Sequence, residues 1–465
     1  MADRETPRDR INTYGAPSQL RITDLRLTEI ESSSMRCILL KIETNQGLVG
    51  LGEVRDGASP SYAAMLKSRL VGENPCEVER LFRRIRQFGG PSRQGGGVSG
   101  IEIALWDLAG KAYQVPGYQM LGGRYRDTVP MYCDLGKTPM EQRANGTDKG
   151  RALLERMKRF GFTMGKITLS VDEIQGFFPD EPILSGPKRY LDQIIRTPEY
   201  RPATNAATGL MSVVDKPMSF RKDDYNWIMA PYNLMHVTEH GLDRYEEHLR
   251  AVRDVIGWQT PLAIDHLGHL ELDDMKRLLQ RLEKYNLMWV EDVMPCTMPD
   301  AYRELRRATS TPLACGEDLT YVENFEPLCQ SGGVAVVHPD ICSAGGIAES
   351  KKIGDMAQKH HVAMAMHMCE TPVAALATGH VGLCTENFAA MEFNAPDDPD
   401  WQQLVTGLKQ PLIQEGSFVV PEQPGLGADN FNDEVLKEHL WPNSGGLWQS
   451  TEQWDKERSY DRLWS

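Results

Sequence analysis

Ionisable residues recur at nearly constant intervals through the second half of the chain, each at or just beyond the end of a short apolar run. They follow one another at intervals of 23 to 27 residues: Asp265, Glu291, Glu317, Asp340, His367 and Glu392. A strand, a helix and two short loops take about 25–30 residues, so this interval fits a repeating βα unit. An ionisable group at the carboxyl end of every strand is typical of a (β/α) barrel, whose active site lies on that face. We therefore predict a barrel rather than a doubly wound sheet, whose site lies at one switch point.

The apolar runs themselves are short and unbroken, as in strands that are buried on both faces of a parallel sheet. They occupy residues 129–133, 262–264, 287–290, 312–315, 334–337, 362–366 and 388–391. Lys166 ends a further candidate strand, but it precedes Asp265 by 99 residues, far more than one βα unit needs. Because a helix with a glycine stop is predicted at residues 238–256, residues 170–236 form an insertion. We expect a lid or an interface element there.

The first part of the chain, up to about residue 126, has a different pattern. Two β-rich runs at residues 20–25 and 37–42 predict an antiparallel pair, and two helices are expected over residues 61–86 and 100–113. A small sheet followed by helices indicates an α+β unit. The barrel is predicted to begin at residue 127 and to end near residue 394.

The composition limits which partners the protein is expected to bind and in which cellular compartment it is expected to occur. The net charge of −14 argues against a protein that grips nucleic acid. No apolar run is long enough for a membrane helix, and the first five residues lack the apolar core of a secretory signal. The nine scattered cysteines form no CxxC pair, which indicates a reducing, cytoplasmic setting. The last 25 residues hold four tryptophans, so we expect this tail to dock on its own chain or on a second subunit of a homo-oligomer.

Three of the strand-end residues are carboxylates at matching positions on consecutive predicted strands: Asp265, Glu291 and Glu317. Neighbouring strands lie about 4.8 Å apart, so these side chains would crowd into one small volume. Like charges that close either take up protons or surround a cation. Because all the donors are oxygens, Mg²⁺ is the predicted ion. The alternative is three unrelated carboxylates in surface loops.

Asp340 and His367 end the next two predicted strands, where a hydrogen bond between them would make the histidine a general base. The alternative is a structural histidine with a satisfied partner. Glu392 on the following strand would meet a substrate oxygen opposite the metal, unless it faces solvent.

Three further residues are candidates for contact with substrate. Lys166 is either a base or a cation that holds a substrate carboxylate, unless it extends from the barrel rim into solvent. His266 and His269 lie within four residues after Asp265, and either one could protonate a leaving hydroxyl or simply belong to the loop. His269 is preferred because of its reach.

Several short motifs occur in an order and at spacings that resemble the enolase superfamily, in its mandelate racemase-like branch. They are Gly50-Leu51-Gly52-Glu53, Ala104-Leu105-Trp106-Asp107-Leu108-Ala109-Gly110-Lys111, Leu121-Gly122-Gly123, Val290-Glu291-Asp292, Gly316-Glu317-Asp318, and Asp340 five residues before Gly345-Gly346. The resemblance extends from residue 50 to residue 392.

The resemblance implies a (β/α)₇β barrel over residues 127–394, capped by an α+β domain built from residues 1–126 and 395–465. It also implies that Asp265, Glu291 and Glu317 bind Mg²⁺ and that Asp340 and His367 form the catalytic dyad, with His367 as base. Glu392 then matches the glutamate that hydrogen-bonds the substrate carboxylate. The superfamily uses a Lys or His base together with Mg²⁺ that stabilises an ene-diolate.

The chain departs from the family's racemases at one position. Those enzymes carry Lys-x-Lys at the end of the second strand, with the second Lys as base. Here the first lysine is Lys166, and Thr168 occupies the position of the second. Thr168 cannot act as a base at neutral pH, which favours chemistry with one base. We therefore predict dehydration of an acid sugar, an aldonate or aldarate, to a 2-keto-3-deoxy acid. The leaving hydroxyl would be protonated by His367 or by another acid such as His269, with Lys166 assisting through its charge.

Two other functions stay open from the sequence. One is a racemase or epimerase that uses Lys166 and His367, and the other is a non-catalytic binding protein on the same fold. The specificity for a particular sugar is expected to reside in Arg55 and Asp56, near Tyr14, and in the insertion at residues 170–236.

Overall fold

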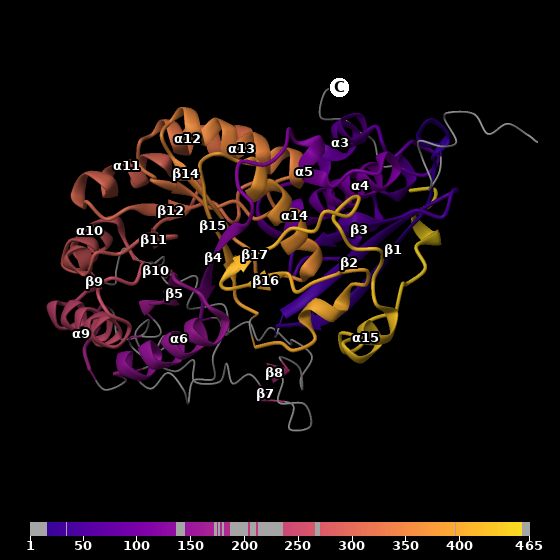
Figure 1. The fold of residues 1–465 in the computed structure, drawn as a ribbon. Coiled ribbons are helices and arrows are strands. Elements are labelled where there is room, and N and C mark those ends of the chain that lie inside the picture. Colours follow the sequence, from indigo (N-terminus) through magenta and orange to yellow (C-terminus); the bar gives the residue numbers. More distant parts are fainter. Residues whose placement is uncertain are drawn as a thin grey trace, which may run out of the picture. The chain divides into compact units, whose positions relative to one another are not determined.

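The computed structural model of the chain describes residues 16–33, 35–135, 145–171, 174, 177–178, 181–186, 203–204, 211–212, 236–265, 270–395 and 397–457. Within these ranges there are an antiparallel sheet near the N-terminus, a larger parallel sheet, and helices (Figure 1). None of the helices within these ranges is long and apolar enough to cross a membrane.

The antiparallel sheet has the order β1 (Ile22–Ser32), β2 (Met35–Thr44) and β3 (Val49–Val54), which confirms the predicted antiparallel pair. The turn between β2 and β3 contains Gly47 with a φ of +80°, a conformation that glycine adopts without strain. The predicted helix over residues 61–86 is wrong. Two shorter helices occur instead, α2 (Ser61–Ala64) and α3 (Val78–Ile85), because Gly72 has a φ of +85° and Pro75 lies between them.

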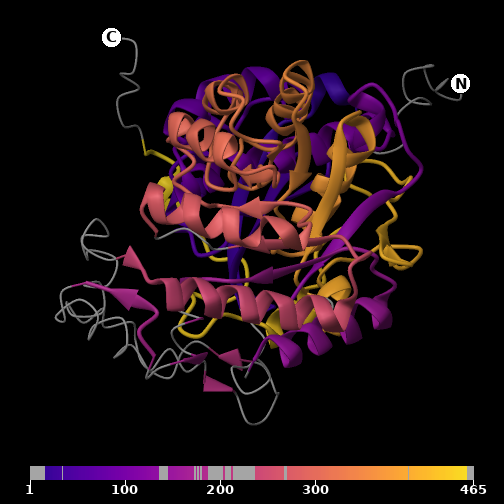
Figure 2. The ribbon, with the colours of Figure 1, turned by 90° about the vertical axis from the view of Figure 1, so that its left-hand side faces the viewer.

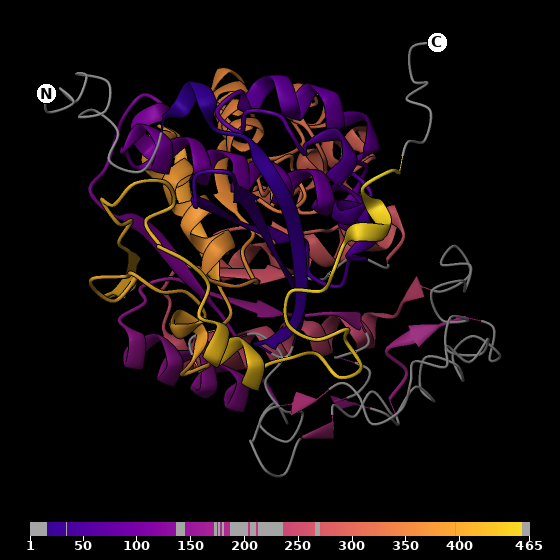
Figure 3. The ribbon, with the colours of Figure 1, turned by 90° about the vertical axis from the view of Figure 1, so that its right-hand side faces the viewer.

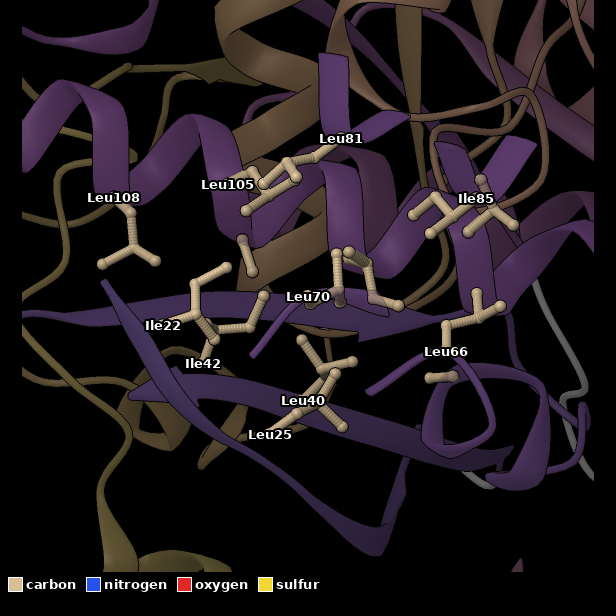
Figure 4. Close-up of a cluster of buried hydrophobic side chains, with 14 of the residues drawn as sticks. Ile22, Leu25, Leu40, Ile42, Leu66, Leu70, Leu81, Ile85, Leu105 and Leu108 are labelled. Atoms are coloured by element: carbon tan, nitrogen blue, oxygen red, sulfur yellow. The ribbon is translucent and has the colours of Figure 1, made fainter. Parts of the chain in front are cut away.

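The predicted helix at residues 100–113 begins earlier, as α4 (Gly96–Tyr113), and it packs closely on β3. The approach depends on glycine, because a Cβ at Gly50 would lie 2.4 Å from the carbonyl oxygen of Ala104. Leucine and isoleucine side chains from the sheet and from these helices fill the space between them. Figure 4 labels ten of them: Ile22, Leu25, Leu40, Ile42, Leu66, Leu70, Leu81, Ile85, Leu105 and Leu108.

The parallel sheet has the strand order β15-β14-β13-β12-β11-β10-β5-β4, and β15 also pairs with β4, so that eight strands close into a barrel. The strands are β4 (Val129–Asp134), β5 (Gly165–Thr168), β10 (Leu262–Asp265), β11 (Val290–Glu291), β12 (Leu313–Cys315), β13 (Val336–Val337), β14 (Ala363–Met366) and β15 (Phe388–Phe393). All seven predicted apolar runs, from residue 129 onward, contribute to these strands, as predicted. A short hairpin of β16 (Ile413–Gln414) and β17 (Ser417–Phe418) lies beside β4.

A long helix packs after each barrel strand from β4 to β14 in the described ranges, which gives the (β/α)₇β order. These helices are α6 (Gly146–Phe160), α9 (Glu239–Ile256), α10 (Leu272–Leu282), α11 (Pro299–Ala308), α12 (Val322–Gln330), α13 (Ile347–Lys359) and α14 (Pro372–Cys384). Helix α9 confirms the predicted helix, since the side chain of Thr238 caps its N-terminus and Gly257 follows its end. Figure 2 shows α6 and α9 packed side by side.

Most of the insertion at residues 170–236 lies outside the described residues. Its described parts include β6 (Leu184–Ser185), which pairs with β9 (His236–Val237), and β7 (Ala203–Thr204), which pairs with β8 (Met211–Ser212). The expected lid or interface role therefore stays a prediction.

The chain divides into two compact units. The first contains residues 1–131, 316–326 and 337–465, and the second contains residues 132–315 and 327–336. The predicted boundaries of a capping domain, residues 1–126 with 395–465, stay a prediction. All nine cysteines are free thiols, and seven of them are buried.

Within the first unit the C-terminal segment runs along the edge strand β1 (Figure 3). Leu27 pairs with Gln449 and Ile30 with Leu440 as antiparallel bridges. The Lys41 ammonium lies 4.5 Å from the centre of the Trp448 ring. The described part of the tryptophan-rich tail thus docks on its own chain.

Candidate active site

In the second unit, three predicted site residues lie together on adjacent strands. Lys166 occupies the second position of β5 rather than its end, and Asp265 and Glu291 are the last residues of β10 and β11. The Lys166 Nζ lies 2.8 Å from Asp265 Oδ2 and 3.4 Å from Glu291 Oε2. All three side chains are buried, so the predicted alternatives, a lysine extending into solvent and carboxylates in surface loops, are wrong for these residues.

Two aromatic residues that the sequence analysis missed support this group. The indole N–H of Trp289 donates to Glu291 Oε2 at 3.0 Å, and Trp289 packs edge-on against Tyr132 with ring centres 5.3 Å apart. The Lys166 Nζ lies 5.6 Å from the centre of the Tyr132 ring. Trp289 stands two residues before Glu291, and the alternation of side chains along a strand could have indicated that both face the same way.

This group of carboxylates fits a hard divalent cation. Oxygen atoms of Asp265, Glu291 and Asp292 lie within 4.8 Å of one another, and Asp292 directly follows the strand end. The donors are all carboxylate oxygens, the ligand type that Mg²⁺ prefers. Lys166 already shows that the position between Asp265 and Glu291 attracts positive charge.

In the first unit, Asp340 and His367 form the hydrogen bond that their spacing predicted. They are joined by a parallel backbone bridge, and His367 Nδ1 lies 2.7 Å from Asp340 Oδ2. The other oxygen, Asp340 Oδ1, accepts from the backbone N–H of Cys342 at 2.7 Å. Burial alone would raise the pKa of Asp340, but the positive charge of Arg55 and the bond to His367 lower that pKa below its usual range.

Arg55 directly follows β3, and its guanidinium reaches the dyad. Its Nη1 lies 2.5 Å from Asp340 Oδ2 and 2.8 Å from Glu370 Oε1, and the Arg55 residue is 1% exposed. Arg55 is therefore a buried partner of the dyad, held between the carboxyl groups of Asp340 and Glu370. Its expected role in selecting the sugar stays a prediction.

Glu370 is a further partner of the dyad that the sequence pattern did not predict. It stands three residues after His367 and is fully buried, and its Oε2 accepts from the backbone N–H of Cys369 at 2.9 Å. Burial raises the pKa of Glu370 well above its usual value, and the neighbouring charge of Asp340 adds to that increase. An acidic residue in the loop after the predicted histidine was the only available signal.

Glu317 and Glu392 also lie near His367. Glu317 Oε2 is 3.3 Å from His367 Nε2, the nitrogen that does not face Asp340. Glu392 lies inside β15 and is 2% exposed, and its Oε2 lies 3.8 Å from His338 Nε2. Glu392 therefore does not face solvent. The ring of His338, another residue that was not predicted, meets the ring of His367 edge-on at 5.9 Å.

Burial would lower the pKa of His367, but its neighbours, Cys369 and Glu317 first among them, raise that pKa well above the usual value. The other predicted histidines, His266 and His269, lie outside the described residues, as does Tyr14.

Comparisons with known proteins agree with this architecture. Residues 17–122 match the N-terminal domain of the mandelate racemase and muconate lactonizing enzyme family, and residues 234–434 match the enolase C-terminal domain-like family. A D-xylonate dehydratase of Haloferax volcanii is 28% identical over 90% of this chain and 89% of its own length. A D-galactonate dehydratase of Pectobacterium atrosepticum is 25% identical over 89% of this chain and 94% of its own.

Among solved structures, a mandelate racemase/muconate lactonizing enzyme-like protein from Rubrobacter xylanophilus superposes with a TM-score of 0.73 at 27% identity. The match covers 93% of this chain and all of the other. The two family matches together cover more than half of the chain, in the expected order. The chain therefore belongs to the enolase superfamily, in the branch of mandelate racemase and muconate lactonizing enzyme.

Proposed function

We propose that this protein is a hydro-lyase that dehydrates an acid sugar, an aldonate or an aldarate, to the 2-keto-3-deoxy acid. The observation that supports this most is the buried bond between His367 Nδ1 and Asp340 Oδ2 at 2.7 Å, which leaves the other ring nitrogen for a substrate proton. Relatives named D-xylonate dehydratase and D-galactonate dehydratase, similar along nine-tenths of the chain, support the substrate class.

His367 is the proposed base. Its Nε2 removes the proton from the carbon next to the substrate carboxylate, and Asp340 keeps the ring in place and stabilises the positive charge that the ring acquires. The hydroxyl on the next carbon then leaves as water. Its proton comes from His367 itself or from another acid such as His269.

Asp265, Glu291 and Glu317 are the proposed ligands of Mg²⁺. The first two end neighbouring strands with their oxygens close together, and Glu317 follows β12, the next strand in the sheet order. Bound there, Mg²⁺ would supply positive charge that offsets the negative charge developing on the substrate carboxylate when the proton leaves.

Lys166 and Glu392 are proposed to bind substrate. Lys166 is ion-paired with two carboxylates, which suits a fixed positive charge better than a base. Because Thr168 occupies the position of the racemases' second lysine, only one base is proposed, and this favours dehydration over racemisation. Glu392 would contact a substrate oxygen from β15.

The test is incubation of the purified protein and Mg²⁺ with a library of acid sugars, followed by detection of 2-keto products. We expect turnover of at least one sugar and its loss in His367→Asn. His361→Asn is the matched control, because His361 is exposed and has a φ of +57°, which asparagine tolerates. No turnover across the library, or exchange of the α-proton without loss of water, would contradict the proposal, and the second result would select the racemase.

A further inference from the structure

The nitrogen Nη1 of Arg55 has three close neighbours but only two hydrogens. Asp340 Oδ2 lies at 2.5 Å, Glu370 Oε1 at 2.8 Å and His367 Nδ1 at 2.9 Å. Arg55, Asp340 and Glu370 are each at most 1% exposed, and His367 is 7% exposed. With so little access for water, these groups must satisfy one another.

The acceptors that are still available determine where the two hydrogens of Arg55 Nη1 point. The second oxygen of each carboxyl group is already used, since Cys342 N–H bonds Asp340 Oδ1 and Cys369 N–H bonds Glu370 Oε2. The two hydrogens of Nη1 are therefore directed to Asp340 Oδ2 and Glu370 Oε1. Glu370 Oε1 accepts whether the carboxyl group is ionised or carries a proton. No hydrogen of Nη1 is left for the imidazole.

The direction of the Arg55 Nη1 hydrogens also determines the tautomer of His367. Because Nη1 gives nothing to Nδ1, the nitrogen Nδ1 must keep its own hydrogen and donate it to Asp340 Oδ2 at 2.7 Å. In the neutral ring the lone pair then lies on Nε2, the nitrogen on the side of Glu317. A base needs that lone pair free.

We propose that Arg55 and Glu370 are positioning residues that fix which ring nitrogen of His367 keeps its hydrogen. Glu370 takes the second hydrogen of Arg55 Nη1, so Nδ1 remains a donor to Asp340. This inference rests on the proposed role of His367 as the base. It adds that the base depends on a buried glutamate and a buried arginine beside the dyad.

Removing Glu370 reverses the arrangement. The second hydrogen of Nη1 then points at its remaining neighbour, His367 Nδ1, which becomes an acceptor while the ring hydrogen moves to Nε2. In that tautomer Nε2 has no lone pair for a substrate proton. Removing Arg55 as well takes away the competing donor, so the double variant returns the hydrogen to Nδ1.

The direct measurement is ¹⁵N NMR of histidine-labelled protein in alkaline buffer with Mg²⁺, where His367→Asn identifies the signals of His367. We expect the hydrogen on Nδ1 in the wild type, on Nε2 in Glu370→Leu, and on Nδ1 again in Arg55→Met/Glu370→Leu. With an active substrate, kcat of Glu370→Leu should fall by at least about 10²-fold, as expected for a wrong histidine tautomer, with a smaller change in KM. The double variant should recover part of kcat.

Glu102→Gln is the matched control, because Glu102 is also a buried glutamate that accepts backbone N–H groups, those of Ile347 and Ala348. It should leave the signals of His367 unchanged. A wild-type hydrogen on Nε2, or a double variant with the hydrogen on Nε2, would overturn the inference even if Glu370→Leu does not fold. Because the spectrum needs no turnover, a hydrogen on Nδ1 in a protein that converts no acid sugar would contradict the proposed function alone.

Discussion

Glu53 caps the first turn of α14 through Thr371, whose backbone N–H it accepts at 3.1 Å and whose hydroxyl it accepts at 2.5 Å. Ala374 N–H donates to the same carboxyl group at 3.1 Å. Burial raises the pKa of Glu53 to about 8, against the lowering effect of these three hydrogen bonds. A residue of β3 thus satisfies the free amides of a barrel helix, next to the loop that holds Glu370.

We expect Thr371→Val to lower the free energy of unfolding by about 1–2 kcal/mol, because it removes a buried donor to Glu53 and the hydroxyl that caps α14. Urea denaturation at neutral pH measures this loss. Thr163→Val, at an exposed position, should change stability by less than about 0.5 kcal/mol. Equal effects of the two substitutions would show that the cap contributes nothing.

Acid should destabilise the fold through a buried histidine of α14. His380 is fully buried, its Nδ1 accepts from the Tyr118 N–H at 3.1 Å, and burial lowers its pKa to about 4. The unfolded chain, with a pKa near 6.5, binds this proton more readily than the folded chain. Stability is therefore complete above about pH 6.5 and falls between there and about pH 4, by about 1.4 kcal/mol per pH unit.

Urea denaturation at several pH values measures this slope. His248, whose pKa burial lowers to about 3, adds to it with the same sign. His380→Gln keeps an acceptor for Tyr118 and cannot titrate, so its slope between pH 6.5 and pH 5 should be shallower by about 1 kcal/mol per unit. If the free energy of unfolding changed with pH in the same way in the variant and the wild type, His380 would not be the source of the slope.

The barrel could be predicted from sequence because its signal repeats. Six apolar runs at βα spacing, each with an ionisable residue near its end, admit few other folds. Asp340 and His367 were predicted as partners for the same reason, since consecutive strands of a barrel are neighbours. The helix expected at residues 61–86 failed because apolar periodicity outweighed Gly72 and Pro75 in that prediction.

The partners of the dyad could not be predicted, because they come from distant parts of the chain. Arg55 follows a strand of the antiparallel sheet and meets Glu370 across 315 residues of sequence. A lone arginine in a loop has many possible partners, and the sequence pattern does not choose among them. The contact of Trp289 with Glu291 is local and could have been found from strand alternation.

Mg²⁺ should raise the melting temperature of metal-free protein, because a ligand that binds only the native state stabilises it. At 100 times its dissociation constant the ion adds about 2.7 kcal/mol. Asp265→Asn and Glu317→Gln should each abolish the shift, whereas Asp273→Asn, at a side chain that is 93% exposed, should retain it. A shift that survives Glu317→Gln would remove Glu317 from the proposed ligands and leave Asp265, Glu291 and Asp292 as the donors.

Trp289 should set the affinity for that ion. Its indole N–H holds Glu291 Oε2 at 3.0 Å, and loss of such a support for a metal ligand typically weakens binding about 10–100-fold. Trp289→Phe keeps the aromatic packing against Tyr132 and removes only the donor, so calorimetric titration with Mg²⁺ should show that loss with little change in melting temperature of the metal-free protein. Trp448→Phe, which removes an indole bond to Asp433 instead, should bind Mg²⁺ as the wild type does. Unchanged affinity in Trp289→Phe would mean that the strand alone positions Glu291.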